Sequence, residues 1–242
     1  MYPEICRIGP FTVYSYGLML VLAFLVSSKL AGIKARSEHL SQDTILNFAF
    51  IVFLCGIIGS RLFYVIENAK FYIKNPVDII KLQEGGLSWF GGLALGGIAG
   101  FAYLKKKKLP IYKVLDLIAP FAALGQAIGR IGCLLNGCCF GKASEFGIYF
   151  PVHGLVLIPT QLYSSLALIF IFIVLRFLQD RPHRQGGIFY AYLLLYSLKR
   201  FFIEFWRADA AEIFLGLTLF QVISILVFFF ACIGLYKCKN TS

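Results

Sequence analysis

The sequence predicts an all-α integral membrane protein with about seven transmembrane helices and a single transmembrane domain over residues 1–242. Of its 242 residues, 59% are hydrophobic and only 14% are charged, whereas about a quarter of the residues in a soluble domain are charged. The apolar residues come in continuous runs, which favour helices over the alternating strands of a β-barrel. Lysine and arginine are also concentrated in alternate connections between these runs.

Each apolar run has a length suited to one membrane span of about 20 residues. The expected spans are residues 12–33, 44–66, 86–104, 112–129, 159–178, 187–207 and 213–236. The first run could be mistaken for a secretory signal peptide, but its basic residues follow the apolar stretch and no small-residue cleavage site stands out. We therefore expect an uncleaved first span with the N-terminus outside.

Basic residues set the expected orientation of these spans. Thirteen of the 23 Lys and Arg residues lie in alternate connections: Lys29, Lys34, Arg36, Lys105, Lys106, Lys107, Lys108, Lys113, Arg176, Arg181, Arg184, Lys237 and Lys239. By the positive-inside rule that side is cytoplasmic, which places the C-terminus there and the short segments 67–85 and 130–158 on the outer face. The same rule explains the net charge of +11 without a nucleic-acid partner.

The third span is rich in glycine, and its glycines fall into two sets. One set repeats every four residues: Gly92, Gly96 and Gly100. This spacing is typical of a helix that another helix approaches closely. The other set consists of two pairs: Gly85–Gly86 and Gly91–Gly92. Paired glycines at a membrane boundary allow irregular backbone, whose N–H groups can hold an anion.

The sixth span carries one polar stripe. Tyr196, Arg200, Glu204 and Arg207 follow one another at helical spacing. Each charge within a bilayer costs about 2.5–3.5 kcal/mol on insertion scales, so such residues normally face a cavity and a partner. An ion pair of Glu204 with either arginine would only lock helices together. Two arginines against one carboxylate nevertheless leave a spare cation, and the planar guanidinium suits a phosphate.

Further polar residues are expected on the same outer side. Arg61 lies among apolar residues with small neighbours, and Arg130 is a second boundary arginine. Tyr16 adds a phenol near the outer end of the first span, where tyrosines are commonly interface anchors. The arginines together predict an outward-facing basic cavity, and its natural anionic ligand is a phospholipid headgroup.

Cys133, Cys138 and Cys139 form the one cysteine cluster of the chain, and the residues alone leave its chemistry open. A zinc site lacks an obvious fourth ligand, although His153 is close in sequence, and we expect no metal. A thiol near Arg130 could be a nucleophile or a redox group. A Cys133–Cys138 disulfide suits an oxidising outer face, and small residues at a helix turn are the plainest interpretation.

Four motifs occur in order along these spans: GGLSWFGGL, GRIGCLLNGCCFG, PTQLYSS and YSLKRFFIEFWRAD. Together with the opening IGPFTVYSYGLM they resemble the bacterial phosphatidylglycerol–prolipoprotein diacylglyceryl transferase family over nearly the whole chain. The resemblance implies an enzyme of the bacterial cytoplasmic (inner) membrane whose cavity opens toward the outer leaflet. It implies transfer of a diacylglyceryl group from phosphatidylglycerol to the lipobox cysteine thiol of a secreted prolipoprotein, releasing glycerol phosphate. It implies no cofactor.

The resemblance also implies roles for individual residues. Arg130 and Arg200 match the arginines that hold and polarise the phosphate, and Tyr16 and Tyr196 match tyrosines of the family's catalytic site. A larger set is expected to bind substrate: Gly85, Gly86, Gly91, Gly92, Arg61, Asn136, Gly141, Glu204 and Arg207.

Several positions depart from the family pattern. Phe90 and Ile158 stand where the family has histidines, Cys133 replaces an asparagine and Cys138 replaces a glutamate. Because neither Phe nor Ile can transfer a proton, the general base is unassigned. The open candidates for it are Tyr16, Tyr196, Glu204, Cys133 and Cys138. Two other functions remain as alternatives: a non-catalytic phospholipid-binding or translocating paralogue, and a thiol-redox membrane enzyme.

Overall fold

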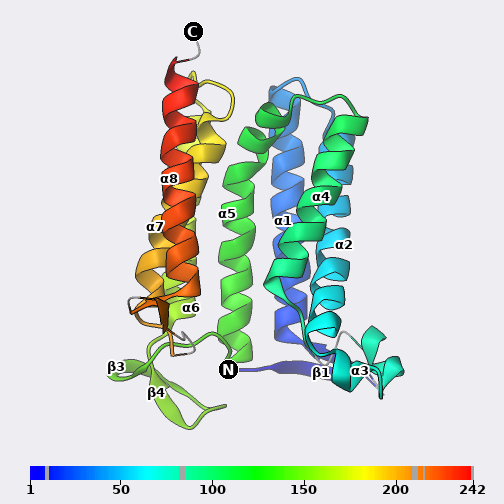
Figure 1. Ribbon diagram of the computed structural model, residues 1–242, viewed down its shortest axis with the longest axis vertical. Helices are drawn as coiled ribbons and strands as arrows, with labels where there is room; N and C mark the ends of the chain where they lie inside the picture. Colours follow the sequence, from blue (N-terminus) through cyan, green and yellow to red (C-terminus); the bar gives the residue numbers. More distant parts are fainter. Residues whose placement is uncertain (9–10, 82–84, 209–211, 215, 241–242) are drawn as a thin grey trace. The chain divides into compact units, whose positions relative to one another are not determined.

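The computed structural model describes residues 1–8, 11–81, 85–208, 212–214 and 216–240, and these residues are mostly helical (Figure 1). The helices are α1 (Ser15–Ser37), α2 (Gln42–Glu67), α3 (Ala69–Tyr72), the 3-10 helix η1 (Pro76–Ile80), α4 (Trp89–Lys106), α5 (Ile111–Asn136), α6 (Thr160–Gln179), α7 (Gly187–Glu204) and α8 (Leu219–Asn240). Each of the seven predicted spans overlaps one long helix, and α5 continues to Asn136, past the predicted end of its span at residue 129. Residues 82–84 of the predicted outer segment and residue 215 of the last predicted span lie outside the described residues.

Five helices among the described residues are long and apolar enough to cross a membrane: α1, α2, α5, α6 and α8. The remaining two, α4 and α7, have 18 residues each. Lysines occupy the last turn of α4, and α7 carries Lys199, Arg200 and Glu204. The structure thus agrees with a helical multi-pass membrane protein. The count of seven spans and the orientation of the termini stay predictions.

Short antiparallel hairpins interrupt the helical pattern, which the sequence analysis did not anticipate. They are β1 (Glu4–Ile8) with β2 (Phe11–Tyr14), β3 (Ala143–Phe150) with β4 (Leu155–Leu157), and β5 (Glu212–Phe214) with β6 (Leu217–Thr218). Strands of two to eight residues leave a periodicity too short to stand out beside apolar runs of about 20 residues.

The chain divides into two compact units. Unit 1 comprises residues 1–27 and 112–242, and unit 2 comprises residues 28–111. Helix α1 contributes to both units, because its first half belongs to unit 1 and its second half to unit 2. The prediction of a single domain stays a prediction.

Helix α6 of unit 1 shows why the protein suits a lipid environment. Its exposed face is apolar: Leu162, Leu166, Phe170, Ile173 and Phe177. Its polar residues are buried instead, including Thr160, Gln161, Ser164 and Ser165. The Ser165 hydroxyl donates to the carbonyl of Ala127 on α5 at 2.9 Å. In hydrocarbon, polar side chains are satisfied by neighbouring helices rather than by water, and this inverted pattern follows.

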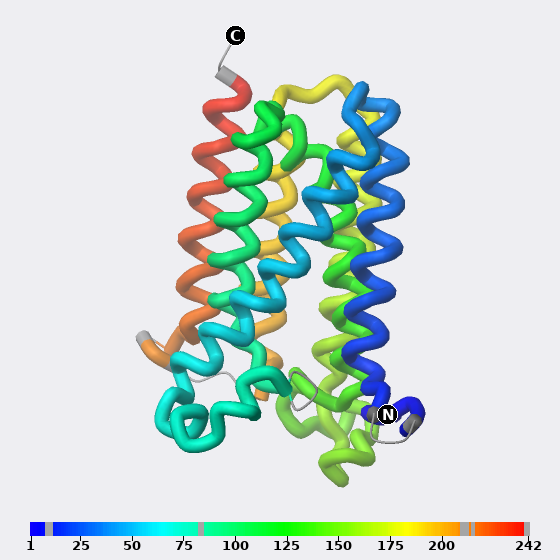
Figure 2. The backbone as a smooth tube through the Cα atoms, turned by 90° about the vertical axis from the view of Figure 1, so that its right-hand side faces the viewer, coloured from blue at the N-terminus to red at the C-terminus, as the bar shows by residue number. Residues whose placement is uncertain are grey.

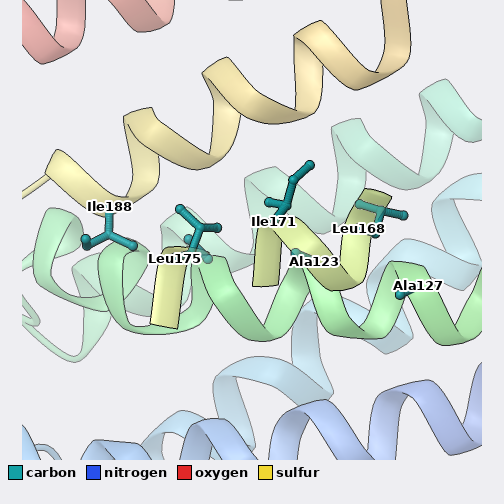
Figure 3. Close-up of a cluster of buried hydrophobic side chains, with 7 residues drawn as sticks. Ala123, Ala127, Leu168, Ile171, Leu175 and Ile188 are labelled. Carbon is teal, nitrogen blue, oxygen red and sulfur yellow. The ribbon is translucent and has the colours of Figure 1, made fainter. Parts of the chain in front are cut away.

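The core of unit 1 lies where α5, α6 and α7 meet (Figure 3). Small residues of α5 at four-residue spacing, Ala119, Ala123 and Ala127, face Leu168, Ile171 and Leu175 of α6 and Ile188 of α7. Alanine on one helix lets the larger side chains of its neighbours approach closely. Helix α7 also lies beside α8 (Figure 1).

A proline fixes how α5 meets α6 and α7. Pro120 has no N–H, so the carbonyl of Asp116 loses its partner within α5. Gln179 at the end of α6 supplies the missing donor, with its Nε2 2.9 Å from that carbonyl oxygen. The carboxylate of Asp116 meanwhile accepts from the backbone N–H of Gly186 and Phe189 at the start of α7, at 2.5 and 2.8 Å. One turn of α5 therefore holds both neighbouring helices.

In unit 2, α2 and α4 lie side by side (Figure 2). Gly59 of α2 and Gly91 of α4 touch through their backbones, and a Cβ added to either would collide with the carbonyl oxygen of the other. A Cβ at Gly92 would likewise collide with the hydroxyl of Ser60, and one at Gly96 would lie 3.1 Å from the carbonyl oxygen of Val52. The predicted close helix approach at this glycine repeat is confirmed.

Candidate functional site

Three segments of unit 1 meet below the end of α7. Gly141, in the loop after α5, forms an isolated antiparallel bridge with Arg207 just beyond α7. Its N–H donates to the carbonyl of Ile158 at 2.8 Å, and the N–H of Lys142 donates to that of Trp206 at 2.8 Å. A Cβ at Gly141 would lie 2.6 Å from the Trp206 carbonyl oxygen, so this position of the motif requires glycine. The bridge holds the loop after α5 against the charged end of α7.

On α7, the predicted stripe forms an ion pair. Arg200 Nη2 lies 3.0 Å from Glu204 Oε2, and the Glu204 side chain is only 2% exposed. The other carboxylate oxygen of Glu204 accepts from the hydroxyl of Thr218 in β6 at 3.1 Å. The Arg200 guanidinium also lies 4.3 Å from the ring centroid of Phe220. Glu204 thus orients Arg200 and neutralises part of its charge.

Other cations surround this pair. Arg130, Lys199 and Arg207 all lie close enough to Arg200 to act on it or on one another electrostatically. Arg130 is half-buried near the end of α5. No hydrogen-bond acceptor or carboxylate among the described residues reaches its guanidinium, so its fork of donors is available to an anion.

Lys199 is a site residue to which the sequence analysis gave no role. It is 9% exposed, and its Nζ lies 4.4 Å from the ring centroid of Tyr196. A lysine beside Arg200 within an apolar run was the available signal, because a charge in a span normally faces a cavity and a partner. Successive residues of a helix point about 100° apart, so Lys199 lies off the stripe that contains Arg200, and the stripe pattern did not include it.

The two tyrosines of the prediction lie in different parts of unit 1. Tyr16 belongs to the first turn of α1, and its ring lies next to Gly132 in the last turns of α5. It is within electrostatic reach of Arg130 and of the cysteine cluster. Tyr196 lies one turn before Arg200 on α7 and carries Lys199 over its ring.

The loop after α5 gathers the three cysteines. Helix α5 ends at Asn136, and Gly137 and Cys139 then take left-handed backbone conformations with φ of 76° and 62°. The Sγ atoms of Cys133, Cys138 and Cys139 all lie within 4.8 Å of one another, and all three are free cysteines. The Cys138 thiol donates to the carbonyl of Cys133 at 3.7 Å. The two neighbouring thiols hold the pKa of the Cys139 thiol below its usual range, and the charges of Arg130 and Arg207 act in the same direction.

Three side chains hold this loop through hydrogen bonds to its backbone carbonyls: one from the turn between β3 and β4 and two from α6. His153 Nε2 lies 2.8 Å from the oxygen of Gly137, Gln161 donates to that of Cys138 at 2.7 Å, and Thr160 donates to that of Cys139 at 2.7 Å. Thr160 and Gln161 are 2% and 1% exposed. The PTQLYSS motif therefore positions the cysteine loop, a role that only the tertiary contacts reveal.

The other predicted substrate residues belong to unit 2. The Arg61 guanidinium donates to the backbone carbonyls of Asp78, Ile79, Lys81, Gly85 and Gly86, at 2.5 to 3.1 Å. It also lies 5.3 Å from the ring centroid of Tyr72.

Gly85 and Gly86 have positive φ, as the predicted irregular backbone requires. They offer their carbonyls to Arg61, whereas the sequence analysis expected their N–H groups to hold an anion. Gly91 and Gly92 lie in the crossing of α2 and α4. Binding of substrate by these unit 2 residues stays a prediction.

Comparison with known proteins gives a consistent result. Residues 3–237 match the family described as prolipoprotein diacylglyceryl transferase. A phosphatidylglycerol–prolipoprotein diacylglyceryl transferase of Clostridium tetani is 33% identical over 216 residues, which cover 86% of each chain. The enzyme of the same name from Finegoldia magna is 34% identical over 88% of this chain and 86% of its own. That from Halalkalibacterium halodurans is 33% identical over 91% of this chain and 81% of its own. With a family match over residues 3–237 and relatives of this identity and coverage, the chain belongs to the prolipoprotein diacylglyceryl transferase family.

Proposed function

We propose that this protein transfers the diacylglyceryl group of phosphatidylglycerol to the lipobox cysteine thiol of a secreted prolipoprotein. The names of its relatives support the two substrates. The observation that carries the proposal in this chain is Arg130, whose guanidinium has no acceptor among the described residues while Arg200, Arg207 and Lys199 lie around it. This concentration of positive charge suits the phosphate of a phospholipid.

In the proposed reaction, the acceptor sulfur attacks the glyceryl carbon that bears the phosphate. An S–C bond forms, the C–O bond to the phosphate breaks, and glycerol phosphate leaves with the bond's electron pair. The proton of the thiol passes to water and the phosphate oxygen leaves as an anion, so atoms and charge balance. Negative charge grows on the departing phosphate, and preorganised guanidinium groups lower the barrier by stabilising it. Arg130 and Arg200 are the groups we assign to this role.

Glu204 is assigned to positioning. Its ion pair with Arg200 and its hydrogen bond from Thr218 hold the guanidinium in one orientation, so that less entropy is lost when the phosphate binds. Tyr16 and Tyr196 are placed beside the cations and are assigned to the glycerol part of the substrate. Asn136 ends α5 at the same loop.

The membrane arrangement belongs to the same proposal. We assign seven spans in the bacterial cytoplasmic membrane, with α4 and α7 as the two short and partly polar ones. The N-terminus lies outside, the C-terminus lies in the cytoplasm, and the charged end of α7 opens toward the outer leaflet, as the distribution of lysine and arginine predicts.

The experiment is a transfer assay in membranes of a strain depleted of its own transferase. Isotope-labelled phosphatidylglycerol is supplied with a lipobox peptide, and mass spectrometry detects the diacylglyceryl adduct and the released glycerol phosphate. We expect an adduct with the cysteine peptide and none with its serine counterpart. Phospholipid that copurifies with the folded wild-type protein but is never cleaved would contradict the proposal and favour the non-catalytic alternative.

A further inference from the structure

Although the sequence alone led us to expect no metal, we infer that Cys133, Cys138 and Cys139 form a three-thiolate site for a zinc ion, and that the open fourth position of this ion binds the acceptor thiol. The first part stands on the structure of unit 1 alone. The second part rests on the proposed function, because it takes the lipobox cysteine as the acceptor.

The spacing of the sulfur atoms is close to what a metal requires. All three Sγ atoms lie within 4.8 Å of one another. Three thiolates around one zinc at a Zn–S distance of about 2.3 Å lie about 4 Å apart. The three sulfur atoms therefore lie within about 1 Å of the separations that a shared zinc ion requires.

The loop that carries these thiols is held in a costly shape. Cys139 adopts a left-handed backbone conformation, with φ of 62°, although it is not glycine. Such a conformation costs on the order of 1–3 kcal/mol and persists only where the surroundings enforce it. Thr160 and Gln161 enforce it here through the carbonyls of Cys139 and Cys138, each at 2.7 Å. Hydrogen bonds from outside a metal site commonly fix the orientation of its ligands in this way.

His153 does not complete a fourth ligand in this arrangement. Its Nε2 is engaged with the Gly137 carbonyl at 2.8 Å, and its ring lies 4.2 Å from that of Phe140, centroid to centroid. Structural zinc sites are closed by four protein ligands, whereas catalytic sites have three and keep one position for water or substrate. Three cysteine ligands, with His153 held by the Gly137 carbonyl instead, correspond to a catalytic zinc site.

Charge and ligand type agree on the metal. Thiolate ligands select soft or borderline cations such as zinc rather than magnesium or calcium. Zinc with three thiolates carries a net charge of −1, and Arg130 and Arg207 are close enough to Cys139 to offset it. Arg130 is also assigned to the phosphate, so the metal would lie beside the leaving group.

The site supplies one way to deprotonate the acceptor thiol, a step for which the sequence leaves several candidate groups open. Phe90 and Ile158 cannot take a proton from the acceptor. A thiol that coordinates zinc is deprotonated outright, and its proton passes to water. The bound thiolate then attacks the glyceryl carbon, the C–O bond breaks, and the glycerol phosphate leaves. The product thioether is a weaker ligand than a thiolate and dissociates, and zinc stays in the +2 state throughout.

The test uses the full-length protein in detergent, reduced and stripped of metal. Cadmium replaces zinc as the probe, because cadmium–thiolate bonds absorb in the ultraviolet. We expect one cadmium per protein with a charge-transfer band. Cys139→Ser should weaken this band, whereas Cys232→Ser on α8 serves as the matched control and should leave it unchanged. Adding a lipobox peptide should raise the absorbance by about one third, as a fourth thiolate joins three, and the serine peptide should not.

The outcomes separate the metal site from the proposed function. Lipid transfer by a wild-type protein that shows no cadmium–thiolate band overturns the site and leaves the function intact. A band that does not respond to the cysteine peptide overturns the role in binding the acceptor. A Cys133–Cys138 disulfide trapped by alkylation in native membranes also overturns the site. A stoichiometric band in a protein that never transfers lipid supports the site and contradicts the proposed function.

Discussion

Arg61 in unit 2 and Arg130 in unit 1 are both arginines within apolar helices, yet the chain surrounds them differently. Arg61 is 6% exposed and donates to five backbone carbonyls between Asp78 and Gly86. Arg130 has no such acceptor among the described residues and lies among other cations. A buried guanidinium whose donors are all used stabilises the fold, whereas one whose donors are unused can bind an anion. The supply of acceptors therefore distinguishes the two roles.

The largest expected effect comes from Arg130→Gln. Removing a donor that stabilises developing charge typically lowers the rate about 10²–10³-fold. We expect this fall in diacylglyceryl transfer with an unchanged melting temperature, because no protein acceptor loses its partner. The exposed Arg181 after α6 gives a matched control, and Arg181→Gln should retain transfer. Equal losses in both variants would contradict the assignment.

Arg61→Gln should show the opposite behaviour. The change leaves several buried carbonyls without a donor, and we expect the free energy of unfolding to fall by about 2–3 kcal/mol. Thermal unfolding in detergent measures this loss, and transfer per folded molecule should stay near that of the wild type. If instead Arg61→Gln abolishes transfer without changing the melting temperature, Arg61 binds substrate and the contrast with Arg130 fails.

The glycines of α4 give a third comparison inside unit 2. Gly91→Ala places a methyl group against the backbone of Gly59, and we expect about 1–2 kcal/mol of destabilisation. A Cβ at Gly97 meets nothing within 4 Å, so Gly97→Ala should be neutral or slightly stabilising because alanine favours the helix. Chemical denaturation of the two variants measures the difference. Two equally stable variants would show that the crossing of α2 and α4 is looser than described.

The smallest effect is expected at the cysteine loop. Thr160→Val keeps the shape of the side chain but removes the hydrogen bond to the carbonyl of Cys139, which should cost about 1 kcal/mol of stability. Since the hydroxyl holds the loop in place, cadmium binding should weaken as well. Ser144→Ala, in exposed β3, changes a local hydrogen bond only and serves as its control. Unchanged cadmium affinity in Thr160→Val would mean that the loop holds its shape without this contact.

Much of the fold followed from composition. Continuous apolar runs and the placement of lysine and arginine predicted a helical membrane protein, and each predicted run overlaps one long helix. The physical reason is that a bilayer forces every spanning backbone group to be satisfied within its own helix, so the apolar run and the helix coincide. The hairpins of two to eight residues per strand were missed because pairing between short strands is decided by contacts, not by periodicity.

The functional site likewise has features that the sequence determined and features that only the tertiary structure decided. The sequence by itself determined which residues could serve a phosphate, because charges are rare and costly in an apolar span and the motifs resemble a known family. It also showed that Phe90 and Ile158 cannot act as bases. Only the tertiary structure decided that Arg61 is engaged by its own chain, that Lys199 joins the cations and that three thiols converge. A residue type specifies what a side chain can bind, but the partners that reach it depend on how distant segments pack, and that information is absent from any single helix.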